Sequence, residues 1–399
     1  MRVLMISDVY FPRINGVSTS IQTFRRGLNA AGVETVLIAP EYPMPWTRDD
    51  EDGIVRIASR YLPRDPEDRA MKIGAIRKLR STLSPRRFDV VHIQTPFIAH
   101  YQGVSIAREL GVPAIETYHT YFEEYLYHYV PLMPRGLMRF IARRFTSSQC
   151  NALDALVVPS RAMRDALENY GVRCPMQVIP TGMDMDRFAA GDGARFRAQL
   201  GIAPGQPTLV HVGRIAHEKN IDFLFRVLRE VVKRRQDVVL IVAGEGPALV
   251  HCKSYVESLG LAKRVRFVGY LSRESALLDC YKAGDLFVFS SKTETQGLVL
   301  LEALALGVPV VSTAHMGTAD IVKPQRGTRM APDEEAGFAD IVVGLLNDPQ
   351  TRSAMAQEAR TYAATWSAAA MASRLIDYYR AAIATRASSQ PELSAQRTG

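Results

Sequence analysis

The stretch from Ser290 to Thr313, SSKTETQGLVLLEALALGVPVVST, constrains the possible folds more than any other part of the chain. It follows a short apolar run, Leu286–Phe289, that predicts a buried strand. A polar loop comes next, and then strong helix formers continue from Leu298 to Leu306 and end at Gly307. The apolar run Val308–Ser312 predicts a second buried strand. Open parallel sheets bind ligands at the carboxyl ends of their strands, so the loop is a candidate binding site.

Two glutamates stand in this unit, Glu294 in the loop and Glu302 one turn inside the helix. A carboxylate accepts two hydrogen bonds at once, which suits the paired hydroxyls of a sugar or a ribose. The pattern alone leaves a plainer alternative open, in which both are solvated glutamates on a surface loop.

The spacing of the glutamates, with A-L-A-x-G-V-P-V-V after the second, resembles the signature of the retaining family 4 glycosyltransferases of GT-B fold. The resemblance implies an α/β protein with two Rossmann-like, doubly wound domains that face a central cleft. It also implies that Glu294 contacts the donor sugar and Glu302 the ribose of the nucleotide, with Thr295, Gln296, Gly297 and Leu298 also binding the donor. Gln296 stands where many members have Phe, and T-Q-G is similar to members that glycosylate lipids.

Strands and helices alternate along the rest of the chain, which predicts parallel sheets covered by helices. At 399 residues the chain is long enough for two domains. We expect an acceptor-binding domain over residues 1–182 and a nucleotide-sugar-binding domain over 183–362. A helix over 363–385 should return to the first domain, as the resemblance implies, and the composition of residues 386–399 predicts a disordered tail.

The first domain holds two residues to which the resemblance gives a role. After the strand Val3–Ser7 and before the helix Ser18–Ala31, Gly16 can let the backbone approach the donor phosphates because it lacks a Cβ. The pair Asn15-Gly16 is equally a turn signal. His119 follows the strand Ala114–Tyr118, and the resemblance places it near the reacting carbon of the donor sugar.

The second domain opens with the strand Thr208–Val212 and continues as GRIAHEKN, which is similar to the family motif G-R-x-x-x-E-K. Gly213 leads this loop, and the cations Arg214 and Lys219 can neutralise a diphosphate leaving group. The resemblance places the nucleotide base near Val268 and Tyr270. The D-x-D formed by Asp184 and Asp186 lies in the expected linker, and the resemblance implies no metal requirement and no cofactor beyond the UDP- or GDP-linked donor.

Two basic and apolar stretches predict amphipathic helices, Arg69–Arg87 and Leu132–Phe145. Each could dock on an anionic membrane surface, or each could pack on its own domain with its basic face in water. No apolar run approaches the ~20 residues of a membrane-spanning helix, and the N-terminus predicts a strand instead of a secretory signal. We therefore expect a cytoplasmic enzyme that is peripheral on the inner face of the membrane.

The formal net charge of +8 is compatible with an anionic ligand or membrane, and the absence of zinc-finger spacing and aromatic-basic RNA signatures disfavours nucleic acid. The sequence thus predicts a retaining hexosyltransferase that moves a sugar from a nucleotide diphosphate to a lipid such as diacylglycerol or a glycolipid. One alternative acceptor is a soluble or polysaccharide-linked sugar. An alternative from another class is a non-enzymatic module that binds nucleotides and membrane surfaces. The identities of the sugar, base and acceptor, and the oligomeric state, do not follow from the sequence.

Overall fold

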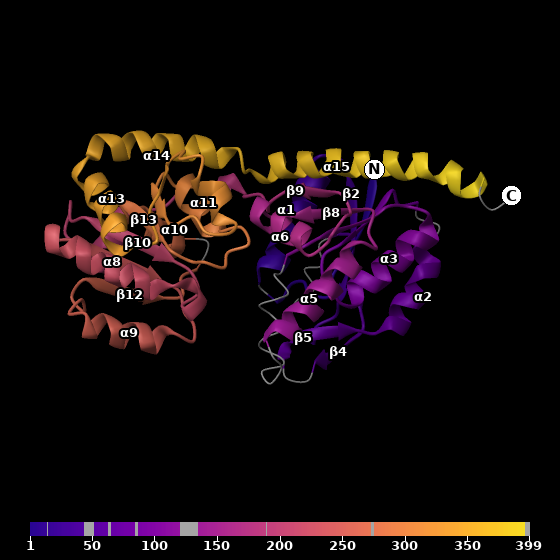
Figure 1. The fold of residues 1–399 in the computed structure, drawn as a ribbon, viewed down its shortest axis with the longest axis horizontal. Helices are drawn as coiled ribbons and strands as arrows, with labels where there is room; N and C mark the ends of the chain where they lie inside the picture. Colours follow the sequence, from indigo (N-terminus) through magenta and orange to yellow (C-terminus); the bar gives the residue numbers. More distant parts are fainter. Residues whose placement is uncertain are drawn as a thin grey trace. The chain divides into compact units, whose positions relative to one another are not determined.

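The computed structural model describes residues 1–13, 15–43, 52–62, 65–83, 87–119, 135–188, 190–272 and 275–395. The chain divides into two compact units. Unit 1 comprises Met1–Gly182 and Ala368–Gly399, and unit 2 comprises Met183–Ser367. Each unit is an α/β layered structure with its own sheet and its own hydrophobic core (Figure 1).

Unit 1 is built on a seven-stranded sheet in the order β3-β2-β1-β6-β7-β8-β9. All of its neighbouring strands pair in parallel. The strands are β1 (Arg2–Ile6), β2 (Glu34–Pro40), β3 (Ile54–Ile57), β6 (Val90–Ile93), β7 (Ala114–Thr117), β8 (Ala155–Val158) and β9 (Met176–Val178). A separate antiparallel hairpin joins β4 (Ser59–Leu62) to β5 (Asp65–Met71).

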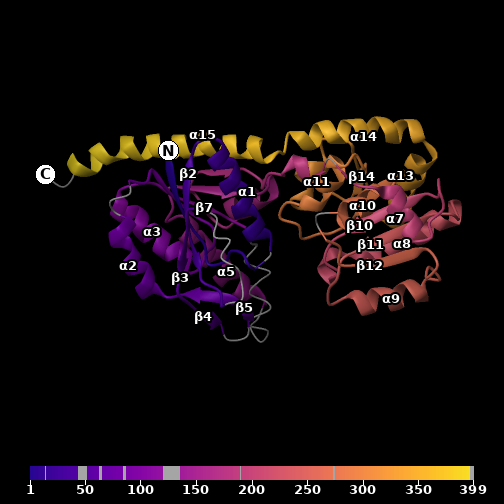
Figure 2. The same ribbon diagram turned by 180° about the vertical axis from the view of Figure 1, so that it is seen from behind.

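Helices cover both faces of this sheet. Alternate side chains of each strand point to opposite faces, and the apolar side chains on both faces are buried under helices. One face packs against α1 (Gly16–Ala30) and α15 (Ala368–Ala395), and Figure 2 shows α15 running beside α1. The two helices approach closely at Gly27, where an added Cβ would lie 2.8 Å from Cβ of Ala372. The other face packs against α2 (Ile73–Leu83), α3 (Ile98–Leu110), α5 (Arg135–Cys150) and α6 (Arg161–Asn169).

Unit 2 holds a six-stranded parallel sheet in the order β12-β11-β10-β13-β14-β15. The strands are β10 (Thr208–Val212), β11 (Val239–Ala243), β12 (Val265–Gly269), β13 (Leu286–Phe289), β14 (Val310–Ser312) and β15 (Thr328–Met330). The α-helices are α7 (Gly193–Gln199), α8 (Ile221–Arg234), α9 (Leu249–Ser258), α10 (Ala276–Lys282), α11 (Leu298–Ala305), α12 (Thr318–Val322), α13 (Glu335–Asn347) and α14 (Pro349–Ala364). Two short 3-10 helices, η1 (Met185–Phe188) and η2 (His217–Lys219), complete it.

Each sheet has a point where the strand order reverses. In unit 1 the chain builds β1, β2 and β3 outward and then starts again at β6 on the other side of β1. In unit 2 it builds β10, β11 and β12 and starts again at β13 beside β10. A crevice opens at such a point because the two flanking loops leave in opposite directions, and ligands of doubly wound folds bind there.

Two sequence expectations for the secondary structure are wrong. The helix expected over Arg69–Arg87 begins only at Ile73, because Arg69 belongs to β5 and its guanidinium lies 3.8 Å from the ring centre of Tyr61. The tail expected to be disordered from residue 386 is helical as far as Ala395. Its Ala, Leu, Glu and Gln residues are good helix formers, and extending an existing helix costs less than starting one.

Candidate donor-binding site

The residues predicted to bind the donor in unit 2 follow neighbouring strands of the sheet. Val268 and Tyr270 stand at the end of β12, Gly213 follows β10, and the Glu294 loop follows β13. Because parallel strands end at the same edge, these residues share one edge of unit 2. Gly213 and the Glu294 loop flank the point where the strand order reverses between β10 and β13.

Gly213 lies where two loops meet. The backbone N–H of Gly213 donates to the carbonyl of Ala243 at 3.0 Å, and that of Ile215 donates to the carbonyl of Glu245 at 2.9 Å. A Cβ added to Gly244, whose φ is +133°, would lie 1.9 Å from the carbonyl oxygen of Gly213. Only glycine therefore permits the β11 loop to support the β10 loop at this distance.

Lys219 and Glu294, predicted separately from two motifs, form an ion pair. Nζ of Lys219 donates to Oε1 of Glu294 at 2.7 Å, and each side chain is about four-fifths buried. Asn220, in the left-handed region with a φ of 55°, links the same loops. Its side-chain amide donates to the carbonyl of Ser290 at 3.3 Å, and the Ser290 hydroxyl donates to the carbonyl of Asn220 at 2.9 Å. These contacts bring the predicted cation and the predicted sugar-binding carboxylate together.

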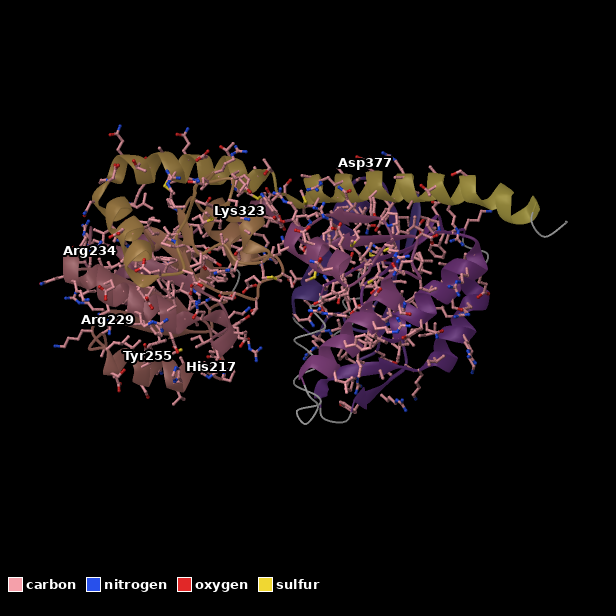
Figure 3. All side chains as sticks on the ribbon, viewed as in Figure 1. His217, Arg229, Arg234, Tyr255, Lys323 and Asp377 are labelled. Atoms are coloured by element: carbon pink, nitrogen blue, oxygen red, sulfur yellow. The ribbon has the colours of Figure 1, made fainter. Side chains whose placement is uncertain are left out.

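Arg214 is placed differently from Lys219. Its side chain is 66% exposed and lies 3.9 Å from the carboxylate of Glu218. His217 is on the surface of unit 2 (Figure 3), where its ring centre is 5.2 Å from that of His251 on α9. The loop therefore directs Lys219 toward Glu294 and leaves the guanidinium of Arg214 in solvent, where it can move to meet a ligand.

The loop that carries Glu294 is held by close backbone contacts. The N–H of Gly317 donates to the carbonyl of Glu294 at 2.8 Å, and a Cβ added to Gly317 would lie 2.1 Å from the carbonyl oxygen of Thr295. Gly297 begins α11 with a φ of 90°, a conformation that L side chains rarely adopt. Gln296 is buried and Leu298 is partly buried. The loop conformation thus depends on two glycines at fixed positions.

Glu302 lies on α11 and is 8% exposed. The hydroxyl of Tyr281 on α10 donates to Oε2 of Glu302 at 2.6 Å. The other carboxylate oxygen, Oε1, accepts no hydrogen bond from the described residues. A buried carboxylate with one oxygen fixed is preorganised to accept a hydrogen bond from a ligand with the other.

At the β12 side of the same edge, Tyr270 is exposed and Val268 is partly buried. Gly269, with a φ of 70°, separates them, and its carbonyl accepts from the N–H of Gly244 at 2.8 Å. The predicted base-binding backbone is therefore joined to the β11 loop that supports Gly213.

The two residues predicted in unit 1 lie at the edge where its strands end. Nε2 of His119 is 3.2 Å from Oε1 of Gln94, which follows β6, and burial lowers the pKa of His119 to about 4. His119 is therefore neutral at pH 7. Gly16 is the first residue of α1, and the side chain of Asn15 caps that helix by accepting from the N–H of Ser18 at 2.8 Å.

Sequence reasoning missed three residues at these two edges: Tyr281, Asn220 and Gln94. Gln94 could have been found, because it follows the buried strand β6 directly, and His119 was predicted from the same kind of position. Tyr281 and Asn220 carry no comparable signal, since their roles depend on contacts with residues 21 and 70 positions away.

The part of the chain that the structure describes contains no helix that is both long and apolar enough to cross a membrane.

Comparison with known proteins agrees with this arrangement. The family description "Glycosyltransferase Family 4" matches residues 14–187, and "Glycosyl transferases group 1" matches residues 192–362. The alpha-monoglucosyldiacylglycerol synthase of Streptococcus pneumoniae is 35% identical over 322 residues, which cover 78% of this chain and 71% of that protein. The GDP-mannose-dependent alpha-mannosyltransferase of Mycobacterium tuberculosis is 28% identical over 375 residues, which cover 92% of this chain and 93% of that one.

Solved structures show the same fold. HepE of Anabaena, crystallised in complex with UDP, superimposes with a TM-score of 0.74 at 17% identity and covers 96% of this chain and 100% of its own. The resemblance that the glutamate spacing suggested is confirmed, as is the expectation of two Rossmann-like domains. The chain belongs to the retaining family 4 glycosyltransferases of GT-B fold.

Proposed function

We propose that this enzyme transfers a hexose from a nucleotide diphosphate sugar to a lipid acceptor at a membrane surface. The observation that carries the proposal is the convergence of Lys219, Glu294 and Glu302 on one sheet edge of unit 2. A diphosphate needs a cation, while a sugar and a ribose need hydrogen-bond acceptors, and this edge offers both. The lipid acceptor is supported by relatives whose names specify diacylglycerol or phosphatidylinositol dimannoside.

Lys219 and Arg214 would neutralise the negative charge of the diphosphate as it leaves the sugar. These two side chains would take the place of a metal ion in this step. Glu294 would hold hydroxyls of the donor sugar, and Glu302 would hold the ribose. We assign no carboxylate as a covalent nucleophile, so the acceptor would attack on the face from which the diphosphate departs. A phosphate oxygen of the leaving group would take the proton of the acceptor hydroxyl.

His119 would contact the donor sugar as a neutral hydrogen-bonding group, since a ring with a pKa of about 4 carries no charge at pH 7. Because Gly16 has no side chain, a donor phosphate could approach the start of α1 closely. Unpaired backbone N–H groups there favour binding of an anion. An added Cβ at Gly16 would meet no atom within 4 Å, so nothing in the described protein occupies that space.

The proposed membrane contact is made by α5. Its apolar residues Leu137, Phe140 and Ile141 are exposed, and Arg144 is exposed beside them. By contrast α2, in the other basic stretch, packs Ile76 and Leu83 into the core of unit 1. For α2 the structure thus favours the alternative of packing on its own domain, and α5 is the better candidate for lying in a headgroup layer.

A thermal-shift series with UDP, GDP and ADP tests the donor assignment, because a ligand that binds only the folded protein raises the melting temperature. The nucleotide that gives the largest shift identifies the donor to use in a transfer assay with diacylglycerol. Anomeric analysis of the product then tests the acceptor and the retention together. Transfer to soluble oligosaccharides but not to diacylglycerol would favour the alternative acceptor and contradict the lipid assignment.

A further inference from the structure

A groove of about 340 Å³ lies between α3 and α5 in unit 1. His100 and Tyr101 line it from α3, and Phe145 and Gln149 line it from α5. Its volume is within the range of small-molecule sites, roughly 300 to 1,000 Å³. None of the residues to which we assign donor binding or group transfer lines this groove. It is therefore a concave site that the proposed reaction does not use.

His100 provides the first sign that the groove receives a ligand. The side chain is 2% exposed, and its Nδ1 lies 2.6 Å from Oε2 of Glu116, which is also buried. The other ring nitrogen, Nε2, has no hydrogen-bond partner among the described residues. The bond from Nδ1 to Glu116 fixes the orientation of the ring, so Nε2 is a fixed hydrogen-bonding group for an occupant of the groove.

Gln149 provides a second, independent sign. It is 8% exposed, and its amide nitrogen donates to the carbonyl of Pro96 at 2.9 Å and to the hydroxyl of Tyr101 at 3.3 Å. These bonds fix the orientation of the amide. The amide oxygen has no partner in the described part of the chain, and the hydroxyl proton of Tyr101 remains to be donated. The groove thus presents a rigid set of donors and acceptors.

The lining favours a neutral, hydroxyl-rich ring over other occupants. The exposed rings of Tyr101 and Phe145 offer flat apolar surfaces for the C–H face of a pyranose, and His100, Gln149 and Arg108 can bond its hydroxyls. An alkyl chain would leave these polar groups unpaired, which is costly. A phosphate is disfavoured because Arg108 is the one guanidinium or ammonium group among the lining residues, while Glu116 stands behind His100.

The surroundings indicate how the ring would be presented. Phe145 belongs to both the groove and α5. The exposed residues Ile141, Phe140 and Leu137 stand four, five and eight positions before it on the same helix. A sugar attached to a lipid would place its ring in the groove while its acyl chains meet this apolar face.

We propose that the α3–α5 groove binds the pyranose headgroup of a membrane glycolipid. The proposal rests on the proposed function, because a glycolipid is what the proposed reaction produces. Binding of this kind would retain the enzyme on membranes that already contain glycolipid, without the groove taking part in group transfer.

The test compares binding of the full chain to phosphatidylcholine vesicles with and without a monohexosyl diacylglycerol. High salt is used throughout, since it screens attraction between α5 and the surface. We expect the wild-type enzyme to sediment roughly tenfold more tightly with the glycolipid vesicles, as one or two net hydrogen bonds would give. Ser148→Trp, at an exposed lining position on α5, should fill the groove and remove this preference. Asn169→Trp, at an exposed position on α6 outside the groove, should keep it.

Equal sedimentation of the wild-type enzyme with both kinds of vesicle would overturn the proposal, as would a preference that survives in Ser148→Trp. Transfer to diacylglycerol in detergent micelles is measured on the same preparations. Absence of transfer by the wild-type enzyme would count against the proposed function. Transfer that persists without any glycolipid preference would count against the groove alone.

Discussion

The hydroxyl of Tyr281 on α10 donates a 2.6 Å hydrogen bond to Oε2 of Glu302 on α11. This bond links two neighbouring helices of unit 2 at the carboxylate to which we assign the ribose. Tyr281 itself is completely buried, with its ring centre 5.6 Å from that of Phe287 on β13. The carboxylate therefore takes its orientation from the core of unit 2.

Replacement of Tyr281 by Phe should weaken nucleotide binding, because Glu302 would lose the bond that orients it while the ring packing is retained. We expect a loss of about 1 kcal/mol in affinity for the free nucleotide, close to the value of one net hydrogen bond. Isothermal titration calorimetry with the nucleotide measures it. Unchanged affinity in Tyr281→Phe would show that the bond does not position the carboxylate for the ligand.

Variants of Glu294 and Glu302 should affect nucleotide binding and sugar transfer differently. Glu302→Gln should weaken binding of the free nucleotide, while Glu294→Gln should spare it and lower the rate of transfer. Glutamine keeps the size of each side chain but removes the charge, which roughly halves the strength of its hydrogen bonds. If both variants bound free nucleotide with equal affinity, the assignment of ribose to one and sugar to the other would be wrong.

Lys219→Ala should lower turnover by about 3 kcal/mol of transition-state stabilisation, as is typical for loss of a preorganised charge. The variant also leaves Glu294 without its ion-pair partner, so Arg214→Ala serves as a comparison that leaves this pair intact. We expect both variants to reduce kcat. Because Arg214 is exposed, its variant should melt at the wild-type temperature, and wild-type turnover in either variant would remove that residue from the mechanism.

Docking through α5 should depend on both its apolar and its basic residues. Phe140 and Ile141 are 64% and 46% exposed, so changing both to Ser should leave folding intact. Sedimentation with anionic vesicles should fall about tenfold or more, since two apolar side chains would no longer enter the bilayer. Val250→Ser, at an exposed position on α9, is the matched control.

The electrostatic part of this docking is tested separately. Changing Arg139, Arg143 and Arg144 to Glu should abolish sedimentation at low salt while nucleotide binding is retained. Each basic residue near an anionic surface contributes about 1 kcal/mol, and salt screens that attraction over roughly 8 Å at physiological ionic strength. Equal partitioning of the wild-type enzyme to neutral and anionic vesicles would rule out docking by charge.

His211 should make unit 2 sensitive to acid. Burial lowers the pKa of His211 to about 4 from 6.5, and Nδ1 lies 3.2 Å from the carbonyl of Val288. Below pH 6.5, His211 is protonated in the unfolded chain but stays neutral in folded unit 2. The free energy of unfolding of unit 2 therefore decreases as pH falls from 6.5 toward 4. The contribution is up to about 1.4 kcal/mol per pH unit.

His211→Gln should flatten this dependence by that amount, as measured by urea titrations that are followed through amide hydrogen exchange in β10. An unchanged slope between pH 6.5 and 4 would show that another group controls acid sensitivity in unit 2.

Most of the sheet strands could be predicted from the sequence, because buried parallel strands are continuous apolar runs with little ambiguity. The predicted strands Thr208–Val212 and Leu286–Phe289 have the bounds that the structure gives them. The hairpin of β4 and β5 escaped prediction because Asp65, Glu67 and Asp68 make β5 polar. Arg69 looked like part of a basic helix, but it pairs with Tyr61 across the β4–β5 ladder and its guanidinium lies over the Tyr61 ring.

The candidate site was predictable only where a motif marked it. The Glu294 and Lys219 motifs gave the residues, but their 2.7 Å contact joins positions 75 residues apart, and no local pattern reports such a distance. The partner of Glu302 depends on how α10 packs beside α11, which is set by the core of unit 2. Motifs marked the individual residues of the site, and tertiary packing determines which of them are in contact.

The place of α15 in unit 1 has a consequence for how the protein is made. Tyr379 is completely buried in unit 1, and its hydroxyl lies 2.6 Å from Nδ1 of His92 on β6. A ribosome synthesises Tyr379 after His92, with all of unit 2 between them. At about 5–20 residues per second, the nascent first unit waits on the order of tens of seconds for its last helix. Unit 2 comes second in the chain but can complete its fold first. Until α15 is made, the apolar surface of unit 1 that α15 covers stays exposed and can bind chaperones.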